Sequence, residues 1–181
     1  NDQGTSQTST MESYGIYASN VRHLEMQNVR LDLDKPDTRP ALYAERVQTI
    51  EMDRFLAERS KGGPASIQLS EVQQLLVDGR RAPVAKAEIV NLKAGGSRVV
   101  AGNPFWMTVT ARNAGPPALV EIPLSVGGNP LRRSVWLDSG EEAQVNFIHL
   151  KAVRPGEETA QSGNQTVRFP VLPAPVGHPV E

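Results

Sequence analysis

Cysteine is absent from this chain of 181 residues, and its absence removes three kinds of chemistry at once. There is no cysteine nucleophile, no cysteine-based zinc site and no disulfide. Long hydrophobic runs are missing as well, because no apolar stretch approaches the roughly 18 residues that a membrane-spanning helix needs. Lys and Arg number 19 against 20 for Asp and Glu, so the net charge of −1 gives no reason to expect nucleic acid or an anionic membrane as a partner.

Catalytic and cofactor-binding motifs are also missing from the sequence. There is no glycine-rich phosphate loop, no Ser-His-Asp order and no patch that combines basic and aromatic residues. His23 stands alone among strand-like residues, and His149 has no acidic partner placed by a motif. We therefore expect no catalytic residue, no metal site and no cofactor in this chain.

What the chain does contain is a segment repeated three times with a period near 25 residues. The first copy includes GIYASNVRHLEM, the second, 26 residues later, ALYAERVQTIEM, and the third, after a further 25, SIQLSEVQQLLVDG. A period of this length is typical of solenoids. Fourteen Pro and fifteen Gly favour β-structure with many turns, and the copies lack the 3.6-residue periodicity of helical repeats.

The pattern inside each copy predicts short strands joined by a corner. Ile16 and Ala18 alternate with polar positions, as do Leu24 and Met26, and this period of two is typical of a strand with one buried face. Val21 lies three residues after Ala18 and three before Leu24. This spacing breaks the alternation and indicates a corner. The pattern predicts rungs of a parallel β-helix rather than a leucine-rich repeat, whose Leu and Asn signature is missing. We expect this β-helix to be right-handed. Stacked rungs would form three apolar columns: Ile16, Leu42 and Ile67; Leu24, Ile50 and Leu75; Met26, Met52 and Val77.

The second half of the chain has a different pattern, with no 25-residue repeat after Pro83. Short alternating runs, separated by turn signals such as NAGPP, GGNP and DSGEE, predict roughly seven strands in about 90 residues. Strands of this number and spacing favour an antiparallel immunoglobulin-like β-sandwich. The predicted inward residues are Phe105, Met107, Val109, Ala111, Val120, Ile122, Leu124, Val126, Val135, Leu137, Ala143, Val145, Phe147, Val167, Phe169 and Val171.

We therefore divide this all-β chain into four segments. They are a polar lead-in (residues 1–13), β-helix rungs (14–83), the sandwich (84–173) and a Pro-rich tail (174–181). Three rungs alone would leave an apolar cross-section at their upstream end, which the polar lead-in cannot cover. We expect further rungs to precede Asn1, so that the chain is a fragment of a longer protein.

Residues 14–48, YGIYASNVRHLEMQNVRLDLDKPDTRPALYAERVQ, resemble the last β-helix rungs of polygalacturonase-like enzymes of glycoside hydrolase family 28. The sandwich that follows resembles the immunoglobulin-like modules of secreted carbohydrate-active and adhesion proteins. The resemblance implies inverting hydrolysis of glycosidic bonds, yet the Asn-Thr-Asp, Asp-Asp, Gly-His-Gly and Arg-x-Lys motifs of the family are absent. It therefore implies the non-catalytic end of such an enzyme, with the catalytic rungs upstream.

Four aromatic residues are the candidates for binding a sugar ring. Tyr17 and Tyr43 occupy the same repeat position and are expected to stack on the outer face of adjacent rungs. Trp106 and Trp136 have outward parity in the sandwich. The alternatives are a stabilising Tyr ladder, and packing of the two Trp side chains against the β-helix or a core.

Two groups of acidic residues are candidates for chemistry. Glu25 and Glu51 share a repeat position about 4.8 Å apart, close enough for a glycosidase pair, but their parity predicts a solvated outer position. Asp32, Asp34 and Asp37 could ligate Ca²⁺ through hard oxygens, but they lack the glycine and closing glutamate of an EF-hand loop. A polar loop between two rungs is the favoured interpretation.

The function expected from the sequence is that of a non-catalytic C-terminal portion of a secreted or periplasmic glycoside hydrolase acting on pectin-type polysaccharide. It would complete the β-helix and add a sandwich that caps it, orients it or keeps it near substrate. The alternative is a non-enzymatic surface adhesin or carbohydrate-binding protein. The expected partners are a polysaccharide and the upstream rungs, without nucleic acid or membrane insertion.

Overall fold

The computed structural model describes residues 12–95, 98–152 and 154–174, and over these residues the chain forms strands and turns with no helix. The all-β class expected from the sequence is confirmed. Most of the expected lead-in and tail, residues 1–11 and 175–181, lies outside the described residues. No helix in the described part of the chain has the length and apolar character needed to cross a membrane.

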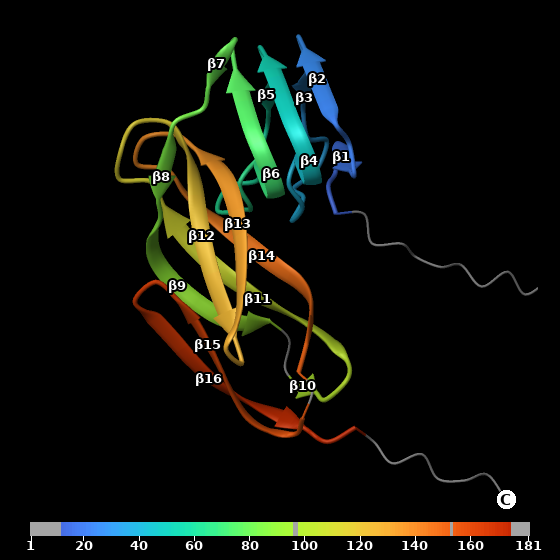
Figure 1. Ribbon diagram of the computed structural model, residues 1–181, viewed down its shortest axis with the longest axis vertical. Coiled ribbons are helices and arrows are strands. Elements are labelled where there is room, and N and C mark those ends of the chain that lie inside the picture. The colour runs from blue at the N-terminus through green and yellow to red at the C-terminus, as the bar shows by residue number, and fades with distance from the viewer. Residues whose placement is uncertain (1–11, 96–97, 153, 175–181) are drawn as a thin grey trace, which may run out of the picture.

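The strands divide into a repeated set and a later set, separated near Pro83 (Figure 1). The repeated set is β1 (Ile16–Ser19), β2 (His23–Gln27), β3 (Arg30–Leu31), β4 (Leu42–Asp53), β5 (Leu56–Ala57), β6 (Ile67–Val77) and β7 (Arg80–Arg81). The later set is β8 (Val84–Lys86), β9 (Glu88–Gly95), β10 (Val99–Val100), β11 (Pro104–Arg112), β12 (Ala118–Val126), β13 (Asn129–Leu137), β14 (Glu142–Lys151), β15 (Gly156–Ser162) and β16 (Gln165–Leu172).

The three copies of the repeat pair in parallel and in register. We call β1 to β6 the parallel stack. Ile16 lies opposite Leu42, which lies opposite Ile67. The same holds for the columns that begin at Leu24 and Met26, so all three predicted columns are confirmed. The middle copy is paired on both sides, and the side chains of Leu42 and Ile50 are fully inaccessible to solvent.

Each copy bends at two backbone corners, and both recur at the repeat spacing. Asn20, Arg46 and Glu71 have φ angles of 57°, 51° and 53°, and Asn28, Arg54 and Asp78 have φ angles of 54°, 53° and 49°. The first corner therefore lies one residue before the predicted position at Val21. The prediction of separate strands on each side of it is wrong for the second and third copies. There, ladder pairing resumes directly after the corner, and β4 and β6 run through it.

The later strands form two layers around a second core. β14, β11 and β9 make an antiparallel three-stranded sheet, and it faces the sheet that contains β13, β12, β15, β16 and β10. Fourteen of the sixteen predicted inward residues are buried, and Val126 and Val167 are partly buried against the same core. The alternation in the sequence therefore predicted the core of this half residue by residue.

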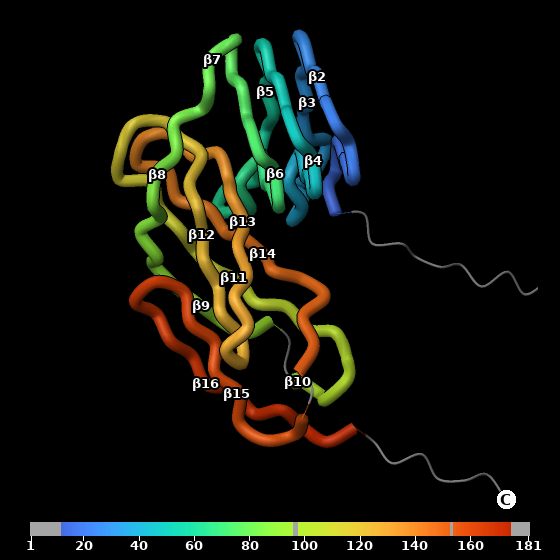
Figure 2. The backbone as a smooth tube through the Cα atoms, viewed as in Figure 1, coloured from blue at the N-terminus to red at the C-terminus, as the bar shows by residue number. Residues whose placement is uncertain are grey.

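The two halves share one sheet. β6 pairs antiparallel with β13, where Leu69 lies opposite Ser134 and Gln68 opposite Val135. An 11-stranded sheet consequently runs from β1 through the stack to β10. Figures 1 and 2 show the stack at one end of an elongated molecule and β10, β15 and β16 at the other.

The two ends of the stack differ. The third copy is covered by β13, by β7, which folds back on β6, and by the side chains of Leu119 and Trp136. In the first copy, β1 and β2 pair with β4 on one side, and no described strand pairs with their other side. Ile16 and Leu24 at this open edge are only half-buried, unlike their counterparts in the middle copy.

Candidate functional site

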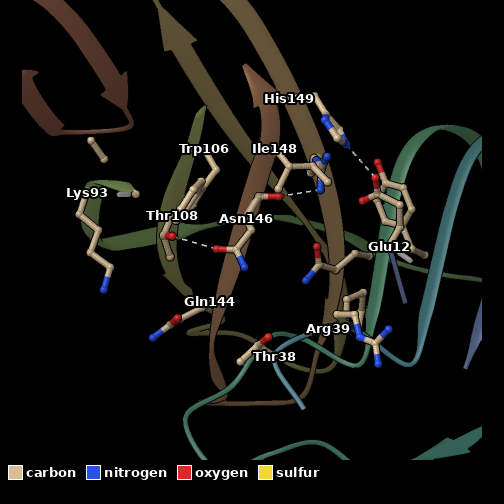
Figure 3. Close-up of a pocket in the computed structure, with 16 residues that line it drawn as sticks. Glu12, Thr38, Arg39, Lys93, Trp106, Thr108, Gln144, Asn146, Ile148 and His149 are labelled. Carbon is tan, nitrogen blue, oxygen red and sulfur yellow. Dashed lines mark hydrogen bonds and ion pairs between the residues drawn. The ribbon is translucent and has the colours of Figure 1, made fainter. Parts of the chain in front are cut away.

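A groove of about 730 Å³ lies at the junction of the two halves. The later strands contribute Lys93, Trp106, Thr108, Gln144, Asn146 and His149, and Arg133 of β13 stands at the boundary. The stack and the segments before β1 and before β4 contribute Glu12, Arg39, Tyr43 and Gln68. Figure 3 shows Lys93 and Trp106 on one side of the groove and Arg39 and Glu12 on the other.

Trp106 is fixed at the edge of the groove by a glycine on the neighbouring strand. Trp106 and Gly95 are cross-strand partners on β11 and β9. A Cβ on Gly95 would lie 1.8 Å from the indole Nε1, so the ring lies directly on the glycine backbone. The Trp106 side chain nevertheless remains 45% exposed. The indole therefore packs on the Gly95 backbone at the edge of the groove, while part of the ring stays open to solvent.

Polar side chains beside Trp106 are held by hydrogen bonds within the groove wall. Thr108 Oγ1 donates to Asn146 Oδ1 at 2.8 Å, which fixes the Asn146 amide (Figure 3). The side chain of Gln68 lines the groove although the residue is only 2% exposed. Amide and hydroxyl groups of this kind donate and accept hydrogen bonds, as sugar hydroxyls require of a partner.

Arg133 lies between two aromatic rings where the halves meet. Its Cζ is 5.0 Å from the centroid of the Tyr43 ring and 5.4 Å from that of Phe147. Its Nη1 donates to the backbone carbonyl of Asn146 at 2.6 Å. These contacts hold the guanidinium at the groove by cation–π attraction and a charged hydrogen bond. Burial raises the pKa of the Tyr43 hydroxyl despite the opposing positive charge of Arg133.

The predicted stacking of Tyr17 on Tyr43 is confirmed. Their ring centroids are 5.9 Å apart and the planes are inclined by 8°. The two differ in environment, since Tyr17 is 47% exposed at the open edge and Tyr43 is 4% exposed beneath the later strands. Tyr43 reaches the groove, while the Tyr17 hydroxyl points into a separate polar cluster.

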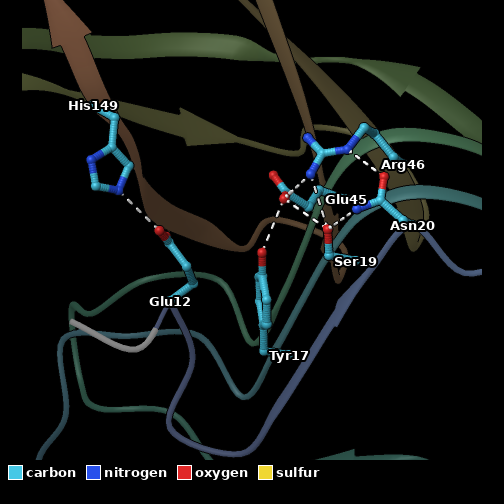
Figure 4. Close-up of polar contacts among 7 residues, drawn as sticks. All are labelled: Glu12, Tyr17, Ser19, Asn20, Glu45, Arg46 and His149. Atoms are coloured by element: carbon cyan, nitrogen blue, oxygen red, sulfur yellow. Dashed lines mark hydrogen bonds and ion pairs between the residues drawn. The ribbon is translucent and has the colours of Figure 1, made fainter. Parts of the chain in front are cut away.

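That polar cluster surrounds Glu45 at the first corner (Figure 4). Glu45 Oε1 accepts from Tyr17 Oη at 2.9 Å, from Ser19 Oγ at 3.0 Å and from Arg46 Nη2 at 2.5 Å. Arg46 Nε also donates to Asn20 Oδ1 at 2.8 Å. Burial raises the pKa of Glu45, but the hydrogen bonds and the Arg46 charge outweigh it, so this pKa lies below its usual value.

The two tryptophans have different environments. Trp106 lines the groove, whereas Trp136 is half-buried and packs against the apolar core of the stack. The alternative of packing between the halves is therefore confirmed for Trp136. Of the four aromatic residues predicted from the sequence, the groove brings together Tyr43 and Trp106.

Four of the acidic candidates either lie on the outer face of the stack or pair with arginine side chains. Glu25 and Glu51 lie opposite each other in register at the predicted outer position, beside a hollow of about 50 Å³. Asp37 accepts from the guanidinium of Arg39 at 2.7 Å and 2.9 Å, which lowers the pKa of its carboxyl group. Arg30 Nε donates to both carboxylate oxygens of Asp32, at 3.1 Å and 2.9 Å. Over the described residues, no three His, Asp or Glu side chains are grouped so that they could hold a metal ion.

Of the two histidines in the described residues, only His149 lines the groove. His23 is exposed on β2, and His149 Nε2 lies 3.1 Å from Glu12 Oε1 at one end of the groove (Figure 4). Sequence reasoning missed Lys93, Arg133 and Asn146. They lie on three different strands, and no local pattern in the sequence marks them as neighbours.

No protein-family model and no curated protein sequence matches the chain. Among solved structures, part of the chain is similar to a β-glucosidase from Listeria innocua in complex with gluconolactone, with a TM-score of 0.35 and 18% sequence identity. The similarity covers 48% of this chain and 16% of the β-glucosidase chain. A likeness of this size carries no argument about fold or activity.

Proposed function

We propose that this chain is a non-catalytic, glycan-binding C-terminal portion of a secreted protein that degrades pectin-type polysaccharide. The observation that supports it is the partly exposed indole of Trp106, which packs on Gly95 and lines a groove together with amide side chains. Sugars bind proteins by stacking the apolar face of the ring on an aromatic surface and by hydrogen-bonding their hydroxyls to polar groups. Among the described residues that line the groove, Glu12 is the only carboxylate, whereas glycosidic hydrolysis uses a pair.

In this proposal, residues 14–83 are the last rungs of a right-handed parallel β-helix and residues 84–173 form an immunoglobulin-like sandwich. The in-register columns and the two recurring corners with positive φ support the β-helix assignment. The two facing sheets support the second. The pairing of β6 with β13 covers the third copy, and the open edge of β1 and β2 is where the proposal places further rungs.

The role of the chain in such a protein is to complete the β-helix and to hold polysaccharide close to catalytic rungs upstream. The resemblance of residues 14–48 to polygalacturonase-like enzymes supports a pectin-type substrate. The outward position of Glu25 and Glu51 and the pairing of Asp37 with Arg39 leave no carboxylate pair facing the groove among the described residues. The chain alone is therefore a binding and capping unit.

Retention of the purified chain on immobilised polysaccharides tests the binding function. We expect the wild-type chain to be retained by at least one plant cell-wall polysaccharide, and Trp106→Ala to weaken retention at least about tenfold. Leu56→Ala is the matched control, because Leu56 is also exposed but lies outside the groove. Absence of retention on every polysaccharide, or equal retention of wild type and Trp106→Ala, would overturn the proposal.

A non-enzymatic surface adhesin is the second candidate, and the single carboxylate among the described groove residues fits it as well as it fits the first. Release of reducing sugars from polygalacturonate separates the two candidates. Neither predicts release by this chain alone. A longer protein that adds the preceding rungs should hydrolyse the polymer if the first candidate is correct and leave it intact if the second is.

A further inference from the structure

The outer edge of β9 has no partner in the part of the chain that the structure describes. β9 pairs with β11 on one side, and no described strand pairs with its other side. Such an edge presents a row of backbone N–H and C=O groups to which an extended strand can bind. Val90 on this strand is apolar and 37% exposed. The edge therefore offers a partner both backbone hydrogen bonds and apolar surface.

A bulge gives the residue pattern of β9 a centre of symmetry. The register with β11 shifts between Ile89 and Asn91, so Val90 is an extra residue without a partner on β11. Counted without this residue, the strand has Asn91 at its centre and one buried apolar residue on each side, Ile89 and Leu92. The next residue on each side is exposed and charged, and the two charges are opposite: Glu88 and Lys93. The pattern of polarity is therefore the same in both directions along the strand.

The backbone of β9 follows the same symmetry. Glu88 lies opposite Arg112 on β11, and Lys93 lies opposite Thr108. Because these two partners are an even number of positions apart, the backbone groups of Glu88 and Lys93 point towards the same side of the strand. The carboxylate of Glu88 is 3.9 Å from the guanidinium of Arg112, a loose ion pair that leaves it free to bind a further cation. Two antiparallel copies of β9 can therefore pair with Glu88 of each opposite Lys93 of the other.

We infer that β9 joins two copies of this chain into a two-fold dimer, in which the outer edges of the two β9 strands pair antiparallel. Glu88 of each copy lies opposite Lys93 of the other, and Asn91 lies on the two-fold axis. Ile89 lies opposite Leu92, so the buried faces of the two sheets are continuous. Opposite charges that face each other across a strand pair stabilise it, and a register shifted by two residues would lose both charge pairs.

The dimer goes beyond the proposed function and has a consequence for the groove. The three-stranded sheets of the two copies would form one continuous sheet across the axis. Lys93 and Trp106 lie on its outer face and line the groove, so the two grooves would lie on the same side. A polymer long enough to reach both would bind at two sites, which raises its affinity without any new contact. The dimer itself needs no ligand, so its test is independent of glycan binding.

Sedimentation velocity of the full chain tests the dimer. Because an edge of eight residues is a small interface, we expect weak self-association, with the average mass rising from monomer towards dimer between about 10 and 500 µM. Glu88→Lys and Lys93→Glu should each weaken it at least about tenfold, because each variant places like charges opposite each other at both ends of the paired strands. An equimolar mixture of the two variants should recover the wild-type strength, since every facing pair in the mixed dimer then joins opposite charges.

Lys151→Glu is the control, since it makes the same change of charge at an exposed residue of β14, at the opposite edge of the same sheet. It should leave self-association unchanged. A chain that stays monomeric at every concentration would overturn the inference, as would an equal loss in Lys93→Glu and Lys151→Glu. Association that persists in both β9 variants would place the contact elsewhere, such as the open edge of β1 and β2. Failure of the mixture to recover would overturn the facing of Glu88 and Lys93.

Discussion

Residues with left-handed backbone fold each copy of the repeat, and none of the six corner residues is a glycine. Asn20 and Asn28 are the corner residues of the first copy. Asparagine tolerates the left-handed backbone region better than most side chains. Arg46 gains hydrogen bonds to Glu45 and Asn20 that offset its strain. Glu71, which forms the equivalent corner of the third copy, is exposed and has a φ of 53°. Strain is therefore least compensated at Glu71.

Substitution of Glu71 measures that strain. Glu71→Gly should raise the free energy of unfolding by up to about 1 kcal/mol, and Glu71→Val should lower it by about 1 kcal/mol or more, because a β-branched residue suits φ > 0 least. Urea denaturation followed by fluorescence measures both. Gln73→Gly, an exposed position in the same strand with ordinary backbone, should instead lower stability by about 0.5–1 kcal/mol. A loss of stability in Glu71→Gly would contradict the strain argument.

Glu45 should make the stability of the stack depend on acid pH. Its folded-state pKa lies below its unfolded value, so its contribution is complete above the unfolded pKa and is lost as pH falls through the folded pKa. We expect wild type to exceed Glu45→Gln in unfolding free energy by up to about 1 kcal/mol at pH 7, since the carboxylate is partly exposed. Thermal unfolding between pH 7 and pH 3 should show this difference shrink below about pH 4.5. A difference that does not change with pH would show that the carboxylate charge contributes nothing.

At the scale of the strands, the middle copy should contribute more to stability than the copy at the open edge. Val47 and Val21 occupy the same repeat position, but Val47 is 1% exposed and Val21 is half-buried. Val47→Ala should therefore lower the free energy of unfolding by about 2 kcal/mol, and Val21→Ala by about half of that. Chemical denaturation of the two variants, which lose the same two methyl groups, gives the comparison. Equal losses would indicate that the edge copy is as tightly packed as the middle one.

Strand-level features were the most predictable part of this molecule. The three columns of the stack and the inward residues of the later strands follow from periodicity, because burying one face requires alternation whatever the partner is. The extent of β4 and β6 was not predictable. A change of parity at Val21 indicates that the chain bends, and it does not say whether pairing resumes on the far side.

At the scale of the whole molecule, the groove could not be predicted, because it depends on which outer faces cover one another. Trp106 and Trp136 have the same outward parity, yet one lines the groove and the other is covered by the stack. Tyr43 and Tyr17 share a repeat position and differ in burial for the same reason. Sequence patterns identify an outer face, and only long-range contacts such as the pairing of β6 with β13 determine what covers it.

The shared sheet has a consequence for how the chain unfolds. β6 and β13 are hydrogen-bonded, Trp136 packs into the core of the stack, and Arg133 lies against a ring from each half. The halves therefore lose contacts together when either one opens. We expect a single calorimetric transition whose enthalpy matches the van't Hoff value, rather than one transition for each half.

Arg133→Met tests this coupling while keeping the length of the side chain. Loss of the cation–π contacts and of the hydrogen bond to Asn146 should lower the free energy of unfolding by about 1–3 kcal/mol. Because the halves are coupled, amide-exchange protection should fall by the same factor in β4 and in β11. Arg132→Met, a change at the exposed neighbouring position, should leave both unchanged. If protection fell in one half alone, or if the wild-type chain unfolded in two steps, the halves would be independent units that merely share a strand pairing.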